Sequence, residues 1–167
     1  GSSRSASRAA TRSLSPPGSL QCGRAVPRPL SMTAVSAPPL ALIVIEDSPD
    51  DYALLLARLA RGERKVDAVR VETRQALDEA LTSRRWDAVI SDHRLPQFTS
   101  LEALAVVRAH DRELPFLIVS GAIGEEVAVE AMRAGADDYL TKDKLGRLEP
   151  ALTRALEAAA ARRRQRA

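Results

Sequence analysis

Residues 40–51 read LALIVIEDSPDD, and this stretch decides the fold class. Its first six residues, 40–45, form a short apolar run that is typical of a strand buried on both faces of a parallel sheet. Two acids, Glu46 and Asp47, follow the run at once. The next four residues, 48–51, supply an N-cap serine, a proline suited to the first helical position and two acids that favour the positive end of a helix. The stretch therefore predicts a strand, an acidic turn and a helix in immediate succession.

The rest of the chain repeats this succession of strand and helix. Apolar or alternating segments predict further strands over 66–71, 87–91, 115–119 and 138–140. Capping residues and apolar periodicity predict helices that begin near Thr73, Thr99, Gly124 and Leu148. Five strands alternating with five helices predict an α/β fold. We expect a doubly wound, five-stranded parallel sheet of the (βα)5 flavodoxin-like type, with strand order 2-1-3-4-5.

Charge is distributed unevenly along the chain. The formal net charge is +3, but residues 1–39 contain five arginines and no acid, and residues 154–167 contain five arginines and one acid. The body between them, residues 40–153, is therefore acidic, which argues against direct nucleic-acid binding. The leader segment 1–39 is rich in Ser, Ala, Arg and Pro without a hydrophobic period, so it is predicted to be disordered.

Two broad classes of protein are excluded by simple features. The only cysteine, Cys22, rules out an internal disulfide, a cysteine-based zinc site and an iron–sulfur cluster. No apolar run approaches the roughly 18 residues that a membrane-spanning helix needs. We expect a soluble, cytoplasmic protein without a membrane partner.

Side chains suited to phosphoryl chemistry follow the predicted strands. Glu46 and Asp47 come after the first strand, Asp92 after the third, Ser120 after the fourth and Lys142 after the fifth. Because the carboxyl ends of parallel strands meet at one edge of the sheet, these groups are expected to converge. Three carboxylates repel one another unless a cation or protons are bound, and oxygen ligands suit Mg²⁺. A hydroxyl and an ammonium suit the oxygens of a phosphoryl group.

Four segments carry a resemblance to a known family. They are 43–51 (IVIEDSPDD), 86–96 (WDAVISDHRLP), 119–121 (VSG) and 135–142 (GADDYLTK). In order and spacing, the chain from residue 40 to 156 resembles a bacterial two-component response-regulator receiver domain of the chemotaxis-protein type.

The resemblance implies roles for these residues. Asp92 would be the phosphoacceptor, and Glu46, Asp47, Asp92 and the backbone carbonyl of Arg94 would hold Mg²⁺. Ser120 would bond one phosphoryl oxygen and act in the switch, and Lys142 would pair with another oxygen. Tyr139 would turn inward on phosphorylation.

The implied function is a phosphorylation-dependent signalling switch. Asp92 would accept a phosphoryl group from the phosphohistidine of a histidine kinase or phosphotransfer protein, and the acyl phosphate would then hydrolyse. The domain would thus catalyse its own phosphorylation and dephosphorylation, although it is not a conventional enzyme. An output domain beyond the C-terminus is a further possible partner.

The chain departs from the usual family pattern at several positions. Glu46 stands where Asp is commoner, Ser120 where Thr is commoner, and Asp143 where Pro is typical. Two alternatives to the switch stay open, and one is a degenerate receiver that acts as a non-phosphorylated interaction module. The other is an aspartyl-phosphate phosphatase, which would need a second acid at the position of Arg94.

The C-terminal segment is expected to extend the last helix. Leu148, Leu152 and Leu156 form a stripe that can pack on the sheet. We expect the receiver domain to span 40–157 and the basic residues 158–167 to form a helical extension that protrudes, frays and does not dimerise. The alternative is a signalling helix that leads into an output domain.

Overall fold

The computed structural model describes residues 37–121 and 124–167. Almost all of the predicted leader, residues 1–39, lies outside the described residues. Within the described ranges, no helix has the length and apolar composition needed to cross a bilayer.

Five parallel strands form one sheet with the order β2-β1-β3-β4-β5. The strands are β1 (Leu40–Ile45), β2 (Val66–Val71), β3 (Ala88–Asp92), β4 (Phe116–Ser120) and β5 (Asp138–Thr141). The helices are α1 (Pro49–Leu59), α2 (Arg74–Ser83), α3 (Ser100–His110), α4 (Glu125–Arg133) and α5 (Leu148–Arg166), with a 3₁₀ helix η1 (Lys142–Arg147) before α5. The predicted fold class and strand order are confirmed.

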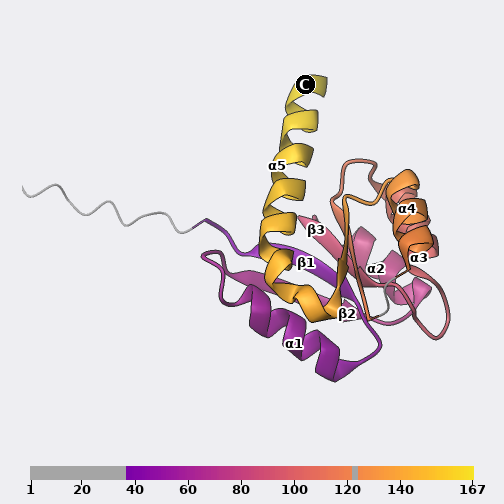
Figure 1. Cartoon of the computed structure of the whole chain (residues 1–167). Helices are drawn as coiled ribbons and strands as arrows, with labels where there is room; N and C mark the ends of the chain where they lie inside the picture. The colour runs from indigo at the N-terminus through magenta and orange to yellow at the C-terminus, as the bar shows by residue number, and fades with distance from the viewer. Residues whose placement is uncertain (1–36, 122–123) are drawn as a thin grey trace, which may run out of the picture. The chain divides into compact units, whose positions relative to one another are not determined.

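Helices cover both faces of the sheet (Figure 1), and apolar side chains line each face. Helices α1 and α5 lie on one side, whereas α2, α3 and α4 lie on the other. Leu42 and Val44 of β1 pack in the cluster that includes α1 and α5, and Ile43 and Ile45 pack in the opposite cluster. This division explains why the run at 40–45 is continuously apolar rather than alternating.

The helices begin at the capping residues that the sequence predicts. The hydroxyl of Ser48 accepts a hydrogen bond from the backbone N–H of Asp51, and Pro49 is the first residue of α1. Thr99 and Glu102 form a reciprocal capping box at the start of α3. These local contacts satisfy N–H groups that a helix end leaves without partners.

The register of the sheet brings the strand ends to one edge. Ile45 pairs with Ser91, and Ser120 pairs with Thr141. The first residue after β1, the last residue of β3 (Asp92) and the first residue after β5 therefore reach the same edge.

The segment 158–167, for which a helical extension is expected, forms the last part of α5. The helix continues to Arg166, and Ala159 is only 2% exposed. Nε of Arg162 and Nη1 of Arg166 each lie 2.7 Å from a carboxylate oxygen of Glu113, in the α3–β4 connection.

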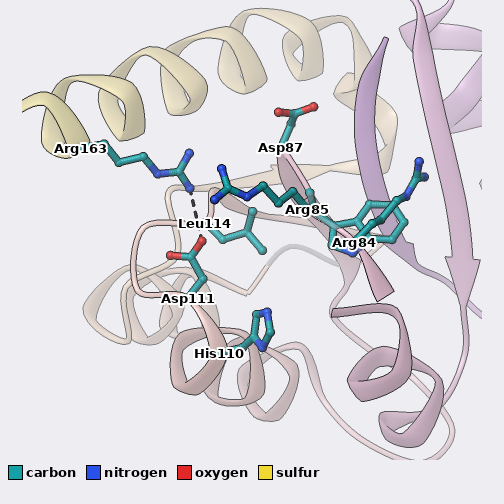
Figure 2. A pocket seen from close by; sticks show the side chains of 8 residues that line it. Arg84, Arg85, Asp87, His110, Asp111, Leu114 and Arg163 are labelled. Carbon is teal, nitrogen blue, oxygen red and sulfur yellow. Dashed lines mark hydrogen bonds and ion pairs between the residues drawn. The ribbon is translucent and has the colours of Figure 1, made fainter. Parts of the chain in front are cut away.

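A further ion pair joins α5 to the same connection. Figure 2 shows a pocket beside it, in which Arg163 of α5 pairs with Asp111 at 3.3 Å. The side chains of Arg162, Arg163 and Arg166 are 41%, 51% and 66% exposed, so these ion pairs lie at the surface. The fraying of 158–167 and its lack of dimerisation stay predictions.

Candidate functional site

Lys142 is the centre of the polar cluster at the carboxyl edge of the sheet. Its Nζ donates hydrogen bonds to Asp51 Oδ2 at 2.7 Å, Asp92 Oδ2 at 3.0 Å and Glu46 Oε2 at 3.1 Å. The three carboxylates come from α1, from the end of β3 and from the residue after β1. One ammonium therefore joins three separate elements of the fold.

Glu46 is held in place through its backbone and its side chain. Its N–H donates to the carbonyl of Val71 at 3.1 Å, and its own carbonyl accepts from Arg70 at 3.2 Å. The second carboxylate oxygen, Oε1, accepts from the N–H of Ser48 at 3.1 Å. Glu46 is consequently 4% exposed and fixed between the end of β1 and the cap of α1.

Burial and ion pairing act in opposite directions on these groups. Burial raises the pKa of Glu46, and the hydrogen bonds from Ser48 and Lys142 lower it only in part. Burial by itself would lower the pKa of Lys142, but the hydrogen bonds to Asp51, Asp92 and Glu46 outweigh it and raise that pKa. The Lys142 ammonium therefore stays charged. The hydrogen bonds to Glu46 offset only part of the effect of its burial.

The predicted metal ligands converge. Glu46, Asp47 and Asp92 each offer a carboxylate oxygen, and these oxygens lie within 4.8 Å of one another. Their exposure rises from the buried Glu46 through the half-buried Asp92 to the exposed Asp47. A site with oxygen donors only, buried on one side and open to water on the other, fits Mg²⁺, which keeps several of its waters.

The loop after β3 is closed by several contacts. The N–H of Arg94 donates to Asp92 Oδ1 at 3.4 Å, and Arg94 forms an isolated bridge with Thr99. Nδ1 of His93 and Oγ of the buried Ser100 share a hydrogen bond of 2.7 Å. The pair Thr99-Ser100 thus fastens α3 to the loop beside Asp92. The metal-binding role of the Arg94 carbonyl stays a prediction.

The two remaining predicted residues lie on neighbouring strands. Ser120 ends β4 and is 2% exposed, at the edge where the carboxylates meet. Tyr139 of β5 is partly buried and packs against the core cluster that contains α2 and α3. Their roles in phosphoryl binding and switching stay predictions.

Asp51 is the site residue that the sequence reading missed. It was expected only to favour the positive end of α1, yet it makes the shortest of the three contacts to Lys142. The two residues are separated by 91 positions, and no local pattern signals such a pair. The nearest available signal is the acid in the first turn of a helix that directly follows the acidic strand end.

Several curated proteins resemble this chain. Transcriptional regulatory protein PrrA of Mycobacterium tuberculosis is 33% identical over 113 residues, which cover 66% of this chain and 46% of PrrA. Response regulator protein PilR of Pseudomonas aeruginosa is 28% identical over 115 residues, which cover 68% of this chain and 25% of PilR. The chain spans about half the length of PrrA and less of PilR.

Solved structures resemble the fold. Full-length FixJ from B. japonicum has a TM-score of 0.65 at 30% identity, covering 73% of this chain and 61% of FixJ. The receiver domain of sensor histidine kinase PA1611 from Pseudomonas aeruginosa, described with a magnesium ion in its active site cleft, has a TM-score of 0.62 at 23% identity. That match covers 71% of this chain and 98% of the PA1611 domain, and it shows likeness of fold alone.

The sequence also matches a family described as the response regulator receiver domain over residues 42–153. This range contains all five strands except the first two residues of β1, together with every residue of the polar cluster. The chain belongs to the family of response regulator receiver domains.

Proposed function

We propose that this protein is a phosphorylation-dependent signalling switch whose phosphoacceptor is Asp92. The phosphoryl donor would be a phosphohistidine on a histidine kinase or a phosphotransfer protein. The observation that carries the proposal is the position of Asp92. The Asp92 side chain is 11% exposed and accepts a hydrogen bond from Lys142 at 3.0 Å. It lies beside two further carboxylates that can hold a cation.

The proposed reaction transfers a phosphoryl group between two side chains. A carboxylate oxygen of Asp92 attacks phosphorus, a new O–P bond forms, and the N–P bond of the phosphohistidine breaks. The leaving imidazole keeps the electron pair of that bond and takes up a proton. Later hydrolysis of the acyl phosphate restores the carboxylate and releases inorganic phosphate.

The chain's own residues would stabilise the charge that accumulates on the phosphoryl oxygens. Lys142 would place its ammonium against one oxygen, and the Ser120 hydroxyl would donate to another. Mg²⁺ held by Glu46, Asp47, Asp92 and the carbonyl of Arg94 would neutralise further negative charge when bound.

The signal would be read outside the described residues. PrrA and PilR extend well beyond the region matched here, and both are named as regulatory proteins. We include in the proposal an output domain or partner protein that distinguishes the phosphorylated from the unphosphorylated form. We expect Ser120 and Tyr139 to carry that difference.

Intact-mass measurement after incubation with acetyl phosphate and Mg²⁺ tests the proposal. We expect one phosphoryl adduct on the wild-type chain and on Asp143→Asn, a control beside Lys142 whose carboxylate is exposed. No adduct is expected on Asp92→Asn. An equal adduct on Asp92→Asn, or no adduct on the wild type with Mg²⁺ present, would refute the assignment.

A further inference from the structure

Lys142 has more acceptors around it than its proposed role requires. An ammonium has three N–H donors, and here all three are directed at carboxylates. Two of these, on Glu46 and Asp92, belong to the predicted metal and phosphoryl site. The third, on Asp51, belongs to neither, although its 2.7 Å contact is the shortest.

Water can replace Lys142 as a hydrogen-bonding partner more easily at one of the three carboxylates than at the other two. The side chains of Glu46 and Asp92 are 5% and 11% exposed, whereas that of Asp51 is 40% exposed. Leaving a buried carboxylate without a hydrogen-bonding partner costs free energy, whereas an exposed carboxylate is readily hydrated. The contact with Asp51 is therefore the easiest of the three for Lys142 to give up.

A phosphoryl group on Asp92 would add oxygens and negative charge beside an ammonium that has no spare donor. We propose that Asp51 is a positioning residue that holds Lys142 against α1 in the unphosphorylated protein and releases it to the phosphoryl oxygens. This inference rests on the proposed function, because it requires Asp92 to be phosphorylated. Asp51 thereby opposes the phosphorylated state by competing for the ammonium.

The competition predicts the direction of a substitution effect. Asp51→Asn removes the charged competitor, so Lys142 binds a phosphoryl group or its analogue more strongly. An exposed ion pair contributes roughly 0.2–1 kcal/mol, which corresponds to at most about a fivefold change in affinity. We expect Asp51→Asn to bind beryllofluoride about two- to fivefold more tightly than the wild type, at saturating Mg²⁺.

The neighbouring acid provides a matched control. Asp50 also lies in the first turn of α1 and carries the same charge, but it is exposed and lies outside the set bonded to Lys142. Asp50→Asn therefore removes a similar long-range charge without removing the contact. We expect its beryllofluoride affinity to stay within experimental error of the wild type.

A double-mutant cycle with Lys142→Gln separates the contact from a structural effect. We expect Asp51→Asn to leave beryllofluoride affinity unchanged in the Lys142→Gln background, because no ammonium remains to be shared. In metal-free protein, the Lys142 Nζ signal in NMR spectra should shift in Asp51→Asn but not in Asp50→Asn.

The outcomes distinguish this inference from the proposed function. If the wild type takes up the phosphoryl group on Asp92 but Asp51→Asn binds beryllofluoride no more tightly than Asp50→Asn, the positioning role is wrong and the function stands. An Asp51→Asn effect that persists in the Lys142→Gln background also overturns the positioning role. If the wild type takes up neither phosphoryl group nor beryllofluoride, the positioning role of Asp51 and the proposed function are both wrong.

Discussion

Replacing Lys142 by methionine tests the electrostatic balance of the site most directly. The substitution keeps an unbranched side chain but removes the ammonium that Glu46, Asp51 and Asp92 share. In metal-free protein these carboxylates then face one another without compensation. We expect Lys142→Met to fold but to have a lower free energy of unfolding.

The size of this loss follows from the burial of the partners. Removing one member of a buried ion pair costs about 3–5 kcal/mol. The Lys142 side chain is 26% exposed and one of its partners, Asp51, is 40% exposed, which reduces the expected cost to about 2 kcal/mol. A domain of this size should then melt roughly 8 °C lower, at about 4 °C per kcal/mol.

Mg²⁺ should recover much of this loss, because the cation supplies positive charge to Glu46 and Asp92. If about 1.4 kcal/mol is recovered, the thermodynamic cycle requires Lys142→Met to bind Mg²⁺ about tenfold more tightly than the wild type. The assay is thermal and urea unfolding with a chelator and across a Mg²⁺ titration.

Lys144→Met is the matched control, since Lys144 is exposed and lies two residues further along η1. It should behave as the wild type in both assays. Equal Mg²⁺ affinities of Lys142→Met and the wild type would contradict the shared use of the carboxylates by ammonium and metal.

Two further predictions concern the end of α5 and the metal site. Arg162→Gln should lower the free energy of unfolding at neutral pH, whereas Arg164→Gln, whose residue is exposed and takes no part in the described ion pairs, should not. The hydrogen bond from Arg162 lowers the pKa of Glu113. The stabilisation from this pair is therefore present above the unfolded-state pKa of Glu113 and is lost as the pH falls through its folded-state pKa. Urea unfolding that showed no such loss would contradict this prediction. Asp47→Ala should weaken Mg²⁺ binding and slow Mg²⁺-dependent phosphorylation by acetyl phosphate, and normal values of both would remove Asp47 from the metal site.

The fold could be predicted because its signals are local. Each strand is a short apolar or alternating run, and Ser48 and Thr99 cap helices within three or four residues. The convergence of Glu46, Asp47 and Asp92 follows from the same information, since parallel strands with alternating helices bring their carboxyl ends to one edge. Short-range patterns were therefore sufficient for the architecture and for most of the candidate site.

The contacts that the sequence did not reveal are long-range pairs of charges. Lys142 meets Asp51 across 91 positions, and Arg162 meets Glu113 across 49. Both pairings depend on how a helix lies over the sheet, and hydrophobic periodicity fixes only which face of that helix is buried. A charge on the other face has many sterically possible partners, so its actual partner emerges only from the packed structure.

The ion pairs at the end of α5 also bear on how the chain's net positive charge is interpreted. From composition alone, residues 154–167 are a basic segment that follows an acidic body. In the structure, Arg162, Arg163 and Arg166 are paired with acids of the α3–β4 and α4–β5 connections. An arginine already paired with a carboxylate gains less from a phosphate backbone, because the existing ion pair must first be broken. Arg162, Arg163 and Arg166 therefore act as surface counter-charges to Asp111, Glu113 and Asp137, so part of the basic segment is matched by acids of the domain body.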